Sequence, residues 1–132
     1  MPRRLIVMRH AKSSWSSGAA TDHARPLNSR GQRDAPRVAK RLNELSWVPD
    51  LILSSDSQRT QETYEAMSAG FENDVPVEFH RSMYHAGLQA IIHEAPAVPD
   101  DVNTLMVLGH NPGWEEVVQQ LSDEIVTMKT AS

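Results

Sequence analysis

The sequence contains no cysteine among its 132 residues. Disulfide bonds, thiolate catalysis and cysteine-bound zinc are therefore excluded, and the absence fits a reducing compartment such as the cytoplasm. The sequence also lacks an apolar run long enough to cross a membrane, and the four apolar residues after Arg4 are too few for a signal peptide. Because 39% of the residues are hydrophobic, the chain can bury a core. We expect one cytoplasmic domain over residues 1–132, with no membrane contact.

The charged residues are unevenly distributed along the chain. Residues 1–66 contain 11 basic and 7 acidic side chains, whereas residues 67–132 contain 2 basic and 10 acidic ones. A basic half can bind nucleic acid or a smaller anion such as phosphate. No arginine-rich run or aromatic platform accompanies it, so we expect no nucleic acid. Four of the basic residues are interpreted as a solvated helix face, namely Arg33, Arg37, Lys40 and Arg41.

Short apolar runs that alternate with helical patterns indicate the fold class. Strands are predicted at Leu5–Met8, Asp50–Ser54, Val75–Phe79 and Thr104–Leu108. Helices are predicted from Asn28 or Ser29 to Leu45, from Gln58 to Ser68, from Leu88 to Glu94, and from Gly113 or Trp114 to Ser122. This alternation predicts a single three-layer α/β domain, with a mainly parallel sheet and helices on both faces.

Two of the predicted helices have specific sequence signals. Val38, Leu42 and Leu45 give the first helix its apolar spacing, and Pro36 inside it predicts a kink or a late start. Gly70 follows the second helix at the position where glycine commonly ends a helix.

Polar residues with catalytic potential follow three of the predicted strands. Arg9 and His10 follow the first strand, Arg59 comes shortly after the second, and His110 follows the last. The carboxyl ends of parallel strands meet at one edge of a sheet, where ligands bind. Two guanidinium groups and two imidazoles at one edge form an anion site suited to a phosphoryl group. The polar loop from Lys12 to Asn28 is long enough to have a function of its own.

Each of these residues also has a simpler interpretation. An isolated Arg-His pair is usually a surface feature, His110 could be a core histidine, and Arg59 could be an ordinary helix-face charge. The repeated placement after a strand favours a shared site over three unrelated residues.

Four sequence segments resemble those of the histidine phosphatase superfamily, which is also called phosphoglycerate mutase-like. They are Met8–Trp15, Asp22–Gly31, Ser54–Thr63 and Leu108–Gly113. The Ala-Lys-Ser continuation after His10 is similar to the SixA-type phosphohistidine phosphatases rather than to the mutases. The resemblance implies a phosphoglycerate mutase-like fold with His10, Arg9, Arg59 and His110 as catalytic residues. It also implies a phosphoryl-binding set of Arg9, Arg25, Arg59 and His110.

The function predicted from these residues is a metal-independent phosphatase that forms a phosphohistidine intermediate on His10. Neutral His10 would attack phosphorus, while the arginines and a protonated His110 would stabilise the charge on the phosphoryl oxygens. The expected substrate is protein phosphohistidine, and phosphate or another oxyanion should bind in the site. Neither a cofactor nor a metal is expected, because His80, His85 and His93 lack ligand spacing with carboxylates. We expect a monomer, with His85 the histidine of these three that lines the cleft.

Two departures from the family pattern keep alternatives open. The family domain continues past a segment like Thr127–Ser132 into a last strand, so either this chain is a fragment or that strand is absent. The stretch Met83–Ala86 has no carboxylate where many members place a proton donor, so the general acid is unidentified. A small-molecule phosphoester phosphatase is one alternative function, and a non-catalytic module that binds a phosphorylated ligand is another.

Overall fold

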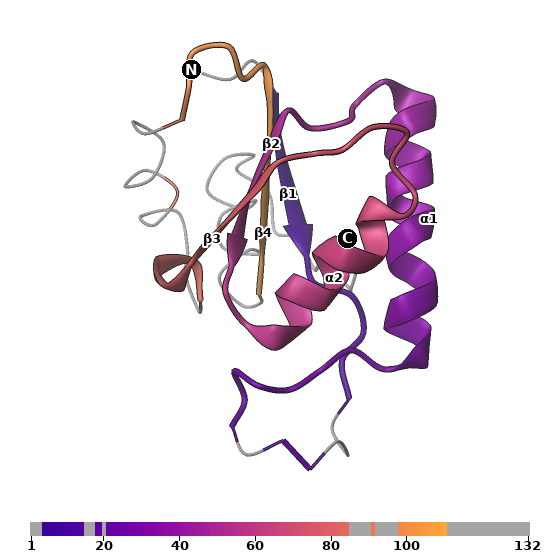
Figure 1. Cartoon of the computed structure of the whole chain (residues 1–132), viewed down its shortest axis with the longest axis vertical. Helices are drawn as coiled ribbons and strands as arrows, with labels where there is room; N and C mark the ends of the chain where they lie inside the picture. The colour runs from indigo at the N-terminus through magenta and orange to yellow at the C-terminus, as the bar shows by residue number, and fades with distance from the viewer. Residues whose placement is uncertain (1–3, 15–17, 20, 85–90, 92–97, 111–132) are drawn as a thin grey trace, which may run out of the picture.

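A computed structural model describes residues 4–14, 18–19, 21–84, 91 and 98–110 (Figure 1). In chain order its elements are β1 (Arg4–Arg9), α1 (Ser29–Leu45), β2 (Leu51–Ser55), α2 (Gln58–Ser68), β3 (Val77–His80), the 3-10 helix η1 (Arg81–Met83) and β4 (Thr104–Gly109). The strands form one parallel sheet in the order β1-β4-β2-β3. In Figure 1 the arrowheads of β1 and β2 point toward the loop between β1 and α1, so this loop lies at the carboxyl edge of the sheet.

Alternate residues of the strands enter two hydrophobic clusters, because successive side chains of a strand point to opposite faces. Met8, Ile52 and Met106 pack on one face with Ala39 of α1 and Met67 of α2. The opposite face packs Leu53, Leu105 and Val107 against Met83, Ile91 and Val102. Every residue of β2 and β4 is buried, as expected for the central strands of a parallel sheet.

Helix α1 begins at a conventional cap. The side chain of Asn28 accepts a hydrogen bond of 2.9 Å from the backbone N–H of Gly31, which satisfies one donor of the first turn. The helix runs through Pro36 from Ser29, so the late start that Pro36 suggested is wrong. Its buried stripe consists of small residues and one leucine, namely Gly31, Ala35, Ala39 and Leu42. Leu45, predicted to belong to the apolar stripe, is 37% exposed.

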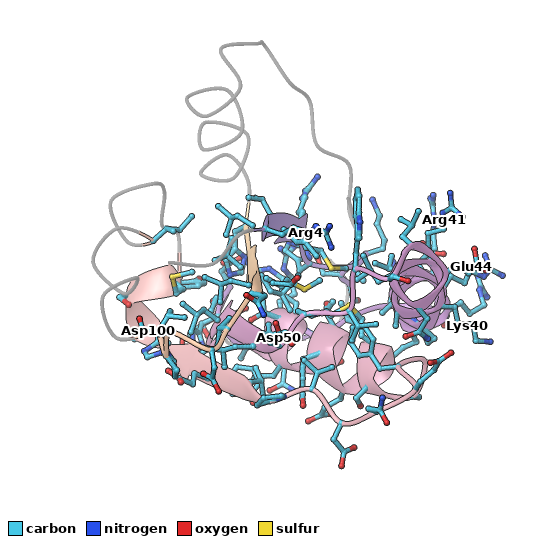
Figure 2. All side chains as sticks on the ribbon, turned by 90° about the horizontal axis from the view of Figure 1, so that it is seen from above. Arg4, Lys40, Arg41, Glu44, Asp50 and Asp100 are labelled. Carbon is cyan, nitrogen blue, oxygen red and sulfur yellow. The ribbon has the colours of Figure 1, made fainter. Side chains whose placement is uncertain are left out.

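The outward face of α1 is charged. Arg33, Arg37, Lys40 and Arg41 are all exposed, which confirms their interpretation as a solvated helix face. Figure 2 shows Lys40, Arg41 and Glu44 projecting from α1 away from the sheet.

Gly70 allows α1 and α2 to pack closely. A Cβ atom at this position would lie 2.6 Å from the carbonyl oxygen of Pro36 and 2.9 Å from the Cβ of Ala39. Such distances are shorter than real Cβ contacts, so only glycine fits without movement of α1. Gly70 does not adopt the left-handed conformation that often ends a helix, since Gly18 is the only described glycine with positive φ.

The predicted parallel α/β sheet is confirmed, and the four strands agree with the predicted ranges to within two residues at each end. Both described α-helices pack on the same face of the sheet. The helices predicted over residues 88–94 and 113–122 lie outside the described residues, except for Ile91. In the described ranges no helix is long and apolar enough to span a membrane.

Candidate active site

Strand register brings the two predicted site histidines together. Arg9 ends β1 and pairs in register with Gly109, the last residue of the neighbouring strand β4. His10 and His110 each follow one of these strands, and their ring centroids lie 5.4 Å apart. Both side chains are buried, with exposed fractions of 5% and 2%. The site therefore begins at the carboxyl edge of the sheet, where parallel strands usually place a ligand.

The hydrogen bond of His10 fixes where the imidazole carries its proton. Its Nδ1 lies 2.6 Å from the backbone carbonyl oxygen of Ala11. A carbonyl oxygen only accepts, so Nδ1 is the protonated nitrogen and donates this bond. Burial is the largest cause that lowers the pKa of His10 to about 4, although the bond to Ala11 raises it. At neutral pH the ring is therefore uncharged, and Nε2 has an available lone pair.

Helix α2 holds the segment that orients His10. The backbone N–H of Ala11 donates to Oγ1 of Thr63 at 3.0 Å, and this hydroxyl donates to the carbonyl of Arg59 at 2.7 Å. Ala11 and Thr63 are both fully buried. The carbonyl that accepts the hydrogen bond from His10 is thus fixed by contacts between the end of β1 and α2.

His110 is oriented by buried hydroxyl groups. Its Nε2 lies 2.8 Å from Oγ of Ser55 and 3.4 Å from Oγ of Ser57. The ring of Tyr84 packs edge-on against it, with 5.3 Å between the centroids. These contacts engage the Nε2 side of the ring and fix the plane of the imidazole beside His10.

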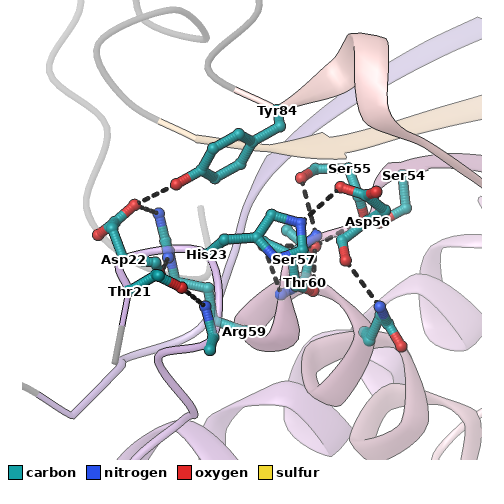
Figure 3. A network of polar contacts seen from close by, with 12 residues as sticks. Thr21, Asp22, His23, Ser54, Ser55, Asp56, Ser57, Arg59, Thr60 and Tyr84 are labelled. Atoms are coloured by element: carbon teal, nitrogen blue, oxygen red, sulfur yellow. Dashed lines mark hydrogen bonds and ion pairs between the residues drawn. The ribbon is translucent and has the colours of Figure 1, made fainter. Parts of the chain in front are cut away.

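Arg59 lies in the first turn of α2 and is only 3% exposed. Its Nη1 donates to the backbone carbonyl of Asp22 at 2.6 Å, and its Nη2 donates to the Asp22 carboxylate at 3.0 Å (Figure 3). The buried Nε of Arg59 has no acceptor among the residues that the structure describes. An anion could accept this remaining N–H.

Two further arginines contribute positive charge. Arg25 Nη2 lies 3.5 Å from the Asp22 carboxylate, and the Arg25 side chain is 11% exposed. Burial, together with the charge of Arg59, lowers the pKa of Arg25. The charges of Arg59, Arg9 and Arg25 all contribute to the low pKa of His10. The structure thus brings together the five predicted residues, while the role of each remains a prediction.

Two residues that the sequence analysis gave no role lie inside this cluster. The Asp22 carboxylate accepts a hydrogen bond of 2.6 Å from the hydroxyl of Tyr84 (Figure 3). Burial raises the pKa of Asp22, but the hydrogen bonds from Tyr84 and Arg59 outweigh it and lower the pKa to about 2. Asp22 is therefore ionised at neutral pH. The resemblance over Asp22–Gly31 was the available signal for Asp22, and nothing comparable marked Tyr84.

A pair formed by His23 and Asp56 lies next to Tyr84. His23 Nε2 is 2.8 Å from the Asp56 carboxylate, and its ring packs edge-on against Tyr84 with 4.9 Å between centroids. His85, predicted to line the cleft, lies outside the described residues, as does His93. Over the described ranges, no three histidine, aspartate or glutamate side chains are grouped closely enough to hold a metal ion.

Comparison with known proteins identifies the family. Residues 5–84 match the histidine phosphatase superfamily (branch 1). An uncharacterized chloroplastic protein of Arabidopsis thaliana is 41% identical, over an alignment covering 98% of this chain and 64% of that protein. The chain belongs to the histidine phosphatase superfamily, and it spans just under two thirds of the length of this plant relative.

Two solved structures place the chain within the superfamily. The structure assigned as the phosphohistidine phosphatase SixA of Agrobacterium tumefaciens is 27% identical, with a TM-score of 0.84, covering 99% of this chain and 88% of that one. The one assigned as SixA of Nakamurella multipartitia is 32% identical, with a TM-score of 0.75, covering 92% and 69%. The chain is a SixA-type member with the phosphoglycerate mutase-like fold, as the sequence resemblance implied.

Proposed function

We propose that this protein hydrolyses protein phosphohistidine through a phosphohistidine intermediate on His10, without a metal ion. The observation that carries the proposal is the state of His10: buried, uncharged at neutral pH, and protonated on Nδ1 by its bond to Ala11. Its Nε2 is then a nucleophile at neutral pH, because an imidazole attacks through its unprotonated nitrogen. The match to the histidine phosphatase superfamily supports phosphatase activity.

The reaction follows from these groups in two steps. In the first, Nε2 of His10 forms a bond to phosphorus while the bond from phosphorus to the leaving group breaks. Arg9, Arg25 and Arg59 stabilise the charge spread over the phosphoryl oxygens, and Nε of Arg59 is available as a donor. In the second step, water attacks phosphorus, the bond to His10 breaks, and inorganic phosphate leaves.

The leaving group favours phosphohistidine over a phosphoester. An alkoxide needs a proton as it leaves, whereas a phosphohistidine protonated on its second ring nitrogen releases a neutral imidazole, which is a far weaker base. Asp22 is the carboxylate beside the arginines, and with a pKa near 2 it is ionised and has no proton to give. A site arranged in this way suits a substrate that requires little general-acid assistance. The likeness to two proteins assigned as phosphohistidine phosphatases supports the same substrate class.

Steady-state kinetics on two substrate classes test the proposal. The full chain is assayed for phosphate release from a protein carrying phosphohistidine and from small phosphoesters such as sugar and glycerate phosphates. We expect a higher kcat/KM for the phosphohistidine protein. A higher kcat/KM for a small ester would replace the proposal with a phosphoester phosphatase, and binding of both without turnover would replace it with a non-catalytic module.

A further inference from the structure

The carboxylate of Asp22 lies against the same guanidinium groups that a phosphoryl group would use. Its Oδ2 accepts from Nη2 of Arg59 at 3.0 Å, and its Oδ1 lies 3.5 Å from Nη2 of Arg25. The hydroxyl of Tyr84 donates to the same Oδ2 at 2.6 Å. Asp22 comes from the loop between β1 and α1, so residues distant in the sequence hold it in this position (Figure 3).

The exposure of these side chains gives their order from the interior outward. Arg59 is 3% and Arg25 is 11% exposed, whereas Asp22 is 43% exposed. The carboxylate therefore lies on the solvent side of two largely buried cations. A phosphoryl group that used Nη2 of Arg59 and Nη2 of Arg25 would compete with the Asp22 carboxylate for these donors.

The Asp22 carboxylate is negatively charged at neutral pH. The hydrogen bonds from Tyr84 and Arg59 outweigh the effect of burial and lower the pKa of Asp22 to about 2. Among the described residues, the charges of Arg9, Arg25 and Arg59 act on a neutral His10, and the Asp22 carboxylate lies beside Arg25 and Arg59. Removing the carboxylate charge would raise the positive charge that faces the anion by one unit, and anion affinity would rise with it.

We propose that Asp22 is an internal counter-anion that competes with the phosphoryl group for Arg59 and Arg25 and so limits the affinity of the site for inorganic phosphate. The inference rests on the proposed function, in which inorganic phosphate is the product that must leave. A site with arginines alone would retain its product, whereas the Asp22 carboxylate replaces phosphate on the same donors as it departs. Asp22 is a positioning and affinity-setting residue in this account, without covalent or proton-transfer chemistry.

The test is calorimetric titration of inorganic phosphate into the wild-type chain and the Asp22→Asn variant. Asparagine keeps an oxygen that can accept from Tyr84 and Arg59, so the substitution removes charge while preserving an acceptor. We expect phosphate to bind about 10-fold more tightly to the variant, equivalent to about 1.4 kcal/mol. Its product-inhibition constant for phosphate should fall by the same factor.

Asp34→Asn is the matched control, because it changes the net charge equally. Asp34 pairs with Arg30 and Arg37 on α1, and phosphate affinity should stay at the wild-type value. Tyr84→Phe is the second variant and keeps the Asp22 charge while removing its hydroxyl donor. Without the Tyr84 hydroxyl the Asp22 carboxylate is held less firmly against Arg59, so phosphate binding should tighten by a smaller factor than in Asp22→Asn. If Asp22→Asn does not fold, unchanged or weaker phosphate binding in Tyr84→Phe overturns the inference.

Unchanged or weaker phosphate binding in a folded Asp22→Asn variant overturns the inference and shows that Asp22 serves only to anchor the loop. Turnover of a phosphohistidine protein is measured on the same wild-type preparation. Lack of turnover there would overturn the proposed function, whereas phosphate affinity decides the role of Asp22 in either case.

Discussion

His10 carries its proton on Nδ1 because the atom beside that nitrogen is a carbonyl oxygen, which can only accept. The burial that excludes water from the ring also disfavours its charged form. The hydrogen bond to the Ala11 carbonyl leaves Nε2 unprotonated in the neutral ring, and burial keeps the ring neutral below pH 7. A solvent-exposed histidine would be partly protonated near pH 6.5 and would lose its nucleophile in that fraction.

The titration of His10 is therefore a direct prediction. We expect its imidazole resonances, assigned by their absence in His10→Asn, to show no titration between pH 8 and pH 5, because the pKa of His10 is lowered to about 4. Since this pKa is lower in the folded than in the unfolded chain, His10 should reduce stability as the pH falls from 6.5 toward 4.

NMR titration of the full chain measures this pKa, and the resonances of the half-buried His80, which pairs with Glu78, are recorded in the same spectra. A His10 midpoint close to 6.5 would contradict the account of its burial and of the nucleophile.

At the scale of elements, the site depends on how strands and helices are joined. Register between β1 and β4 places His10 beside His110, and the contact from Ala11 to Thr63 joins the end of β1 to α2. Helix α2 in turn packs on α1 through Gly70. A change in the contact between the two helices should therefore affect stability before it affects chemistry.

Gly70→Ala tests this packing. The added Cβ would meet the carbonyl of Pro36 at 2.6 Å, and the backbone cannot yield as a flexible side chain could. We expect a loss of about 1–3 kcal/mol in the free energy of unfolding, the usual cost of overpacking. Denaturant unfolding of the variant measures it.

Ser68→Ala, at an exposed position near the end of α2, serves as the control and should change stability by no more than about 0.5 kcal/mol. Equal stability of Gly70→Ala and the wild-type chain would show that the helices separate easily.

The sequence allowed prediction of the strands and of the residues that follow them. Arg9 and His10 come directly after one apolar run and His110 follows another after Gly109, and such runs end where a parallel sheet places its ligands. Arg59 could be placed because α2 starts shortly after β2. These predictions needed only local patterns in the chain.

The contacts of Asp22 and Tyr84 could not be predicted in this way. Asp22 lies in an irregular loop and Tyr84 follows a short 3-10 helix, so neither has a periodic pattern to place it. Their hydrogen bond joins residues 62 positions apart, and it forms only when the sheet has brought both segments to the same edge. The tautomer of His10 was equally inaccessible, because it depends on a backbone carbonyl.

At the scale of the whole molecule, the proposed function gives arginine side chains the positive charge that a bound cation supplies in many phosphatases. We expect turnover to be unchanged after treatment with a chelator and to be inhibited by phosphate-like oxyanions such as vanadate. Steady-state assays with and without the chelator measure this. Loss of activity that a divalent ion restores would contradict the metal-independent proposal.

The central claim is that the phosphoryl group passes through His10. The most direct test is to mix the full chain with a radiolabelled phosphohistidine protein, quench within the first turnover, and locate the label by peptide mass spectrometry. The account predicts an acid-labile phosphoryl group on the peptide containing His10, with no label and no turnover in a folded His10→Asn variant. Label on another residue, or turnover that persists in that variant, would contradict it.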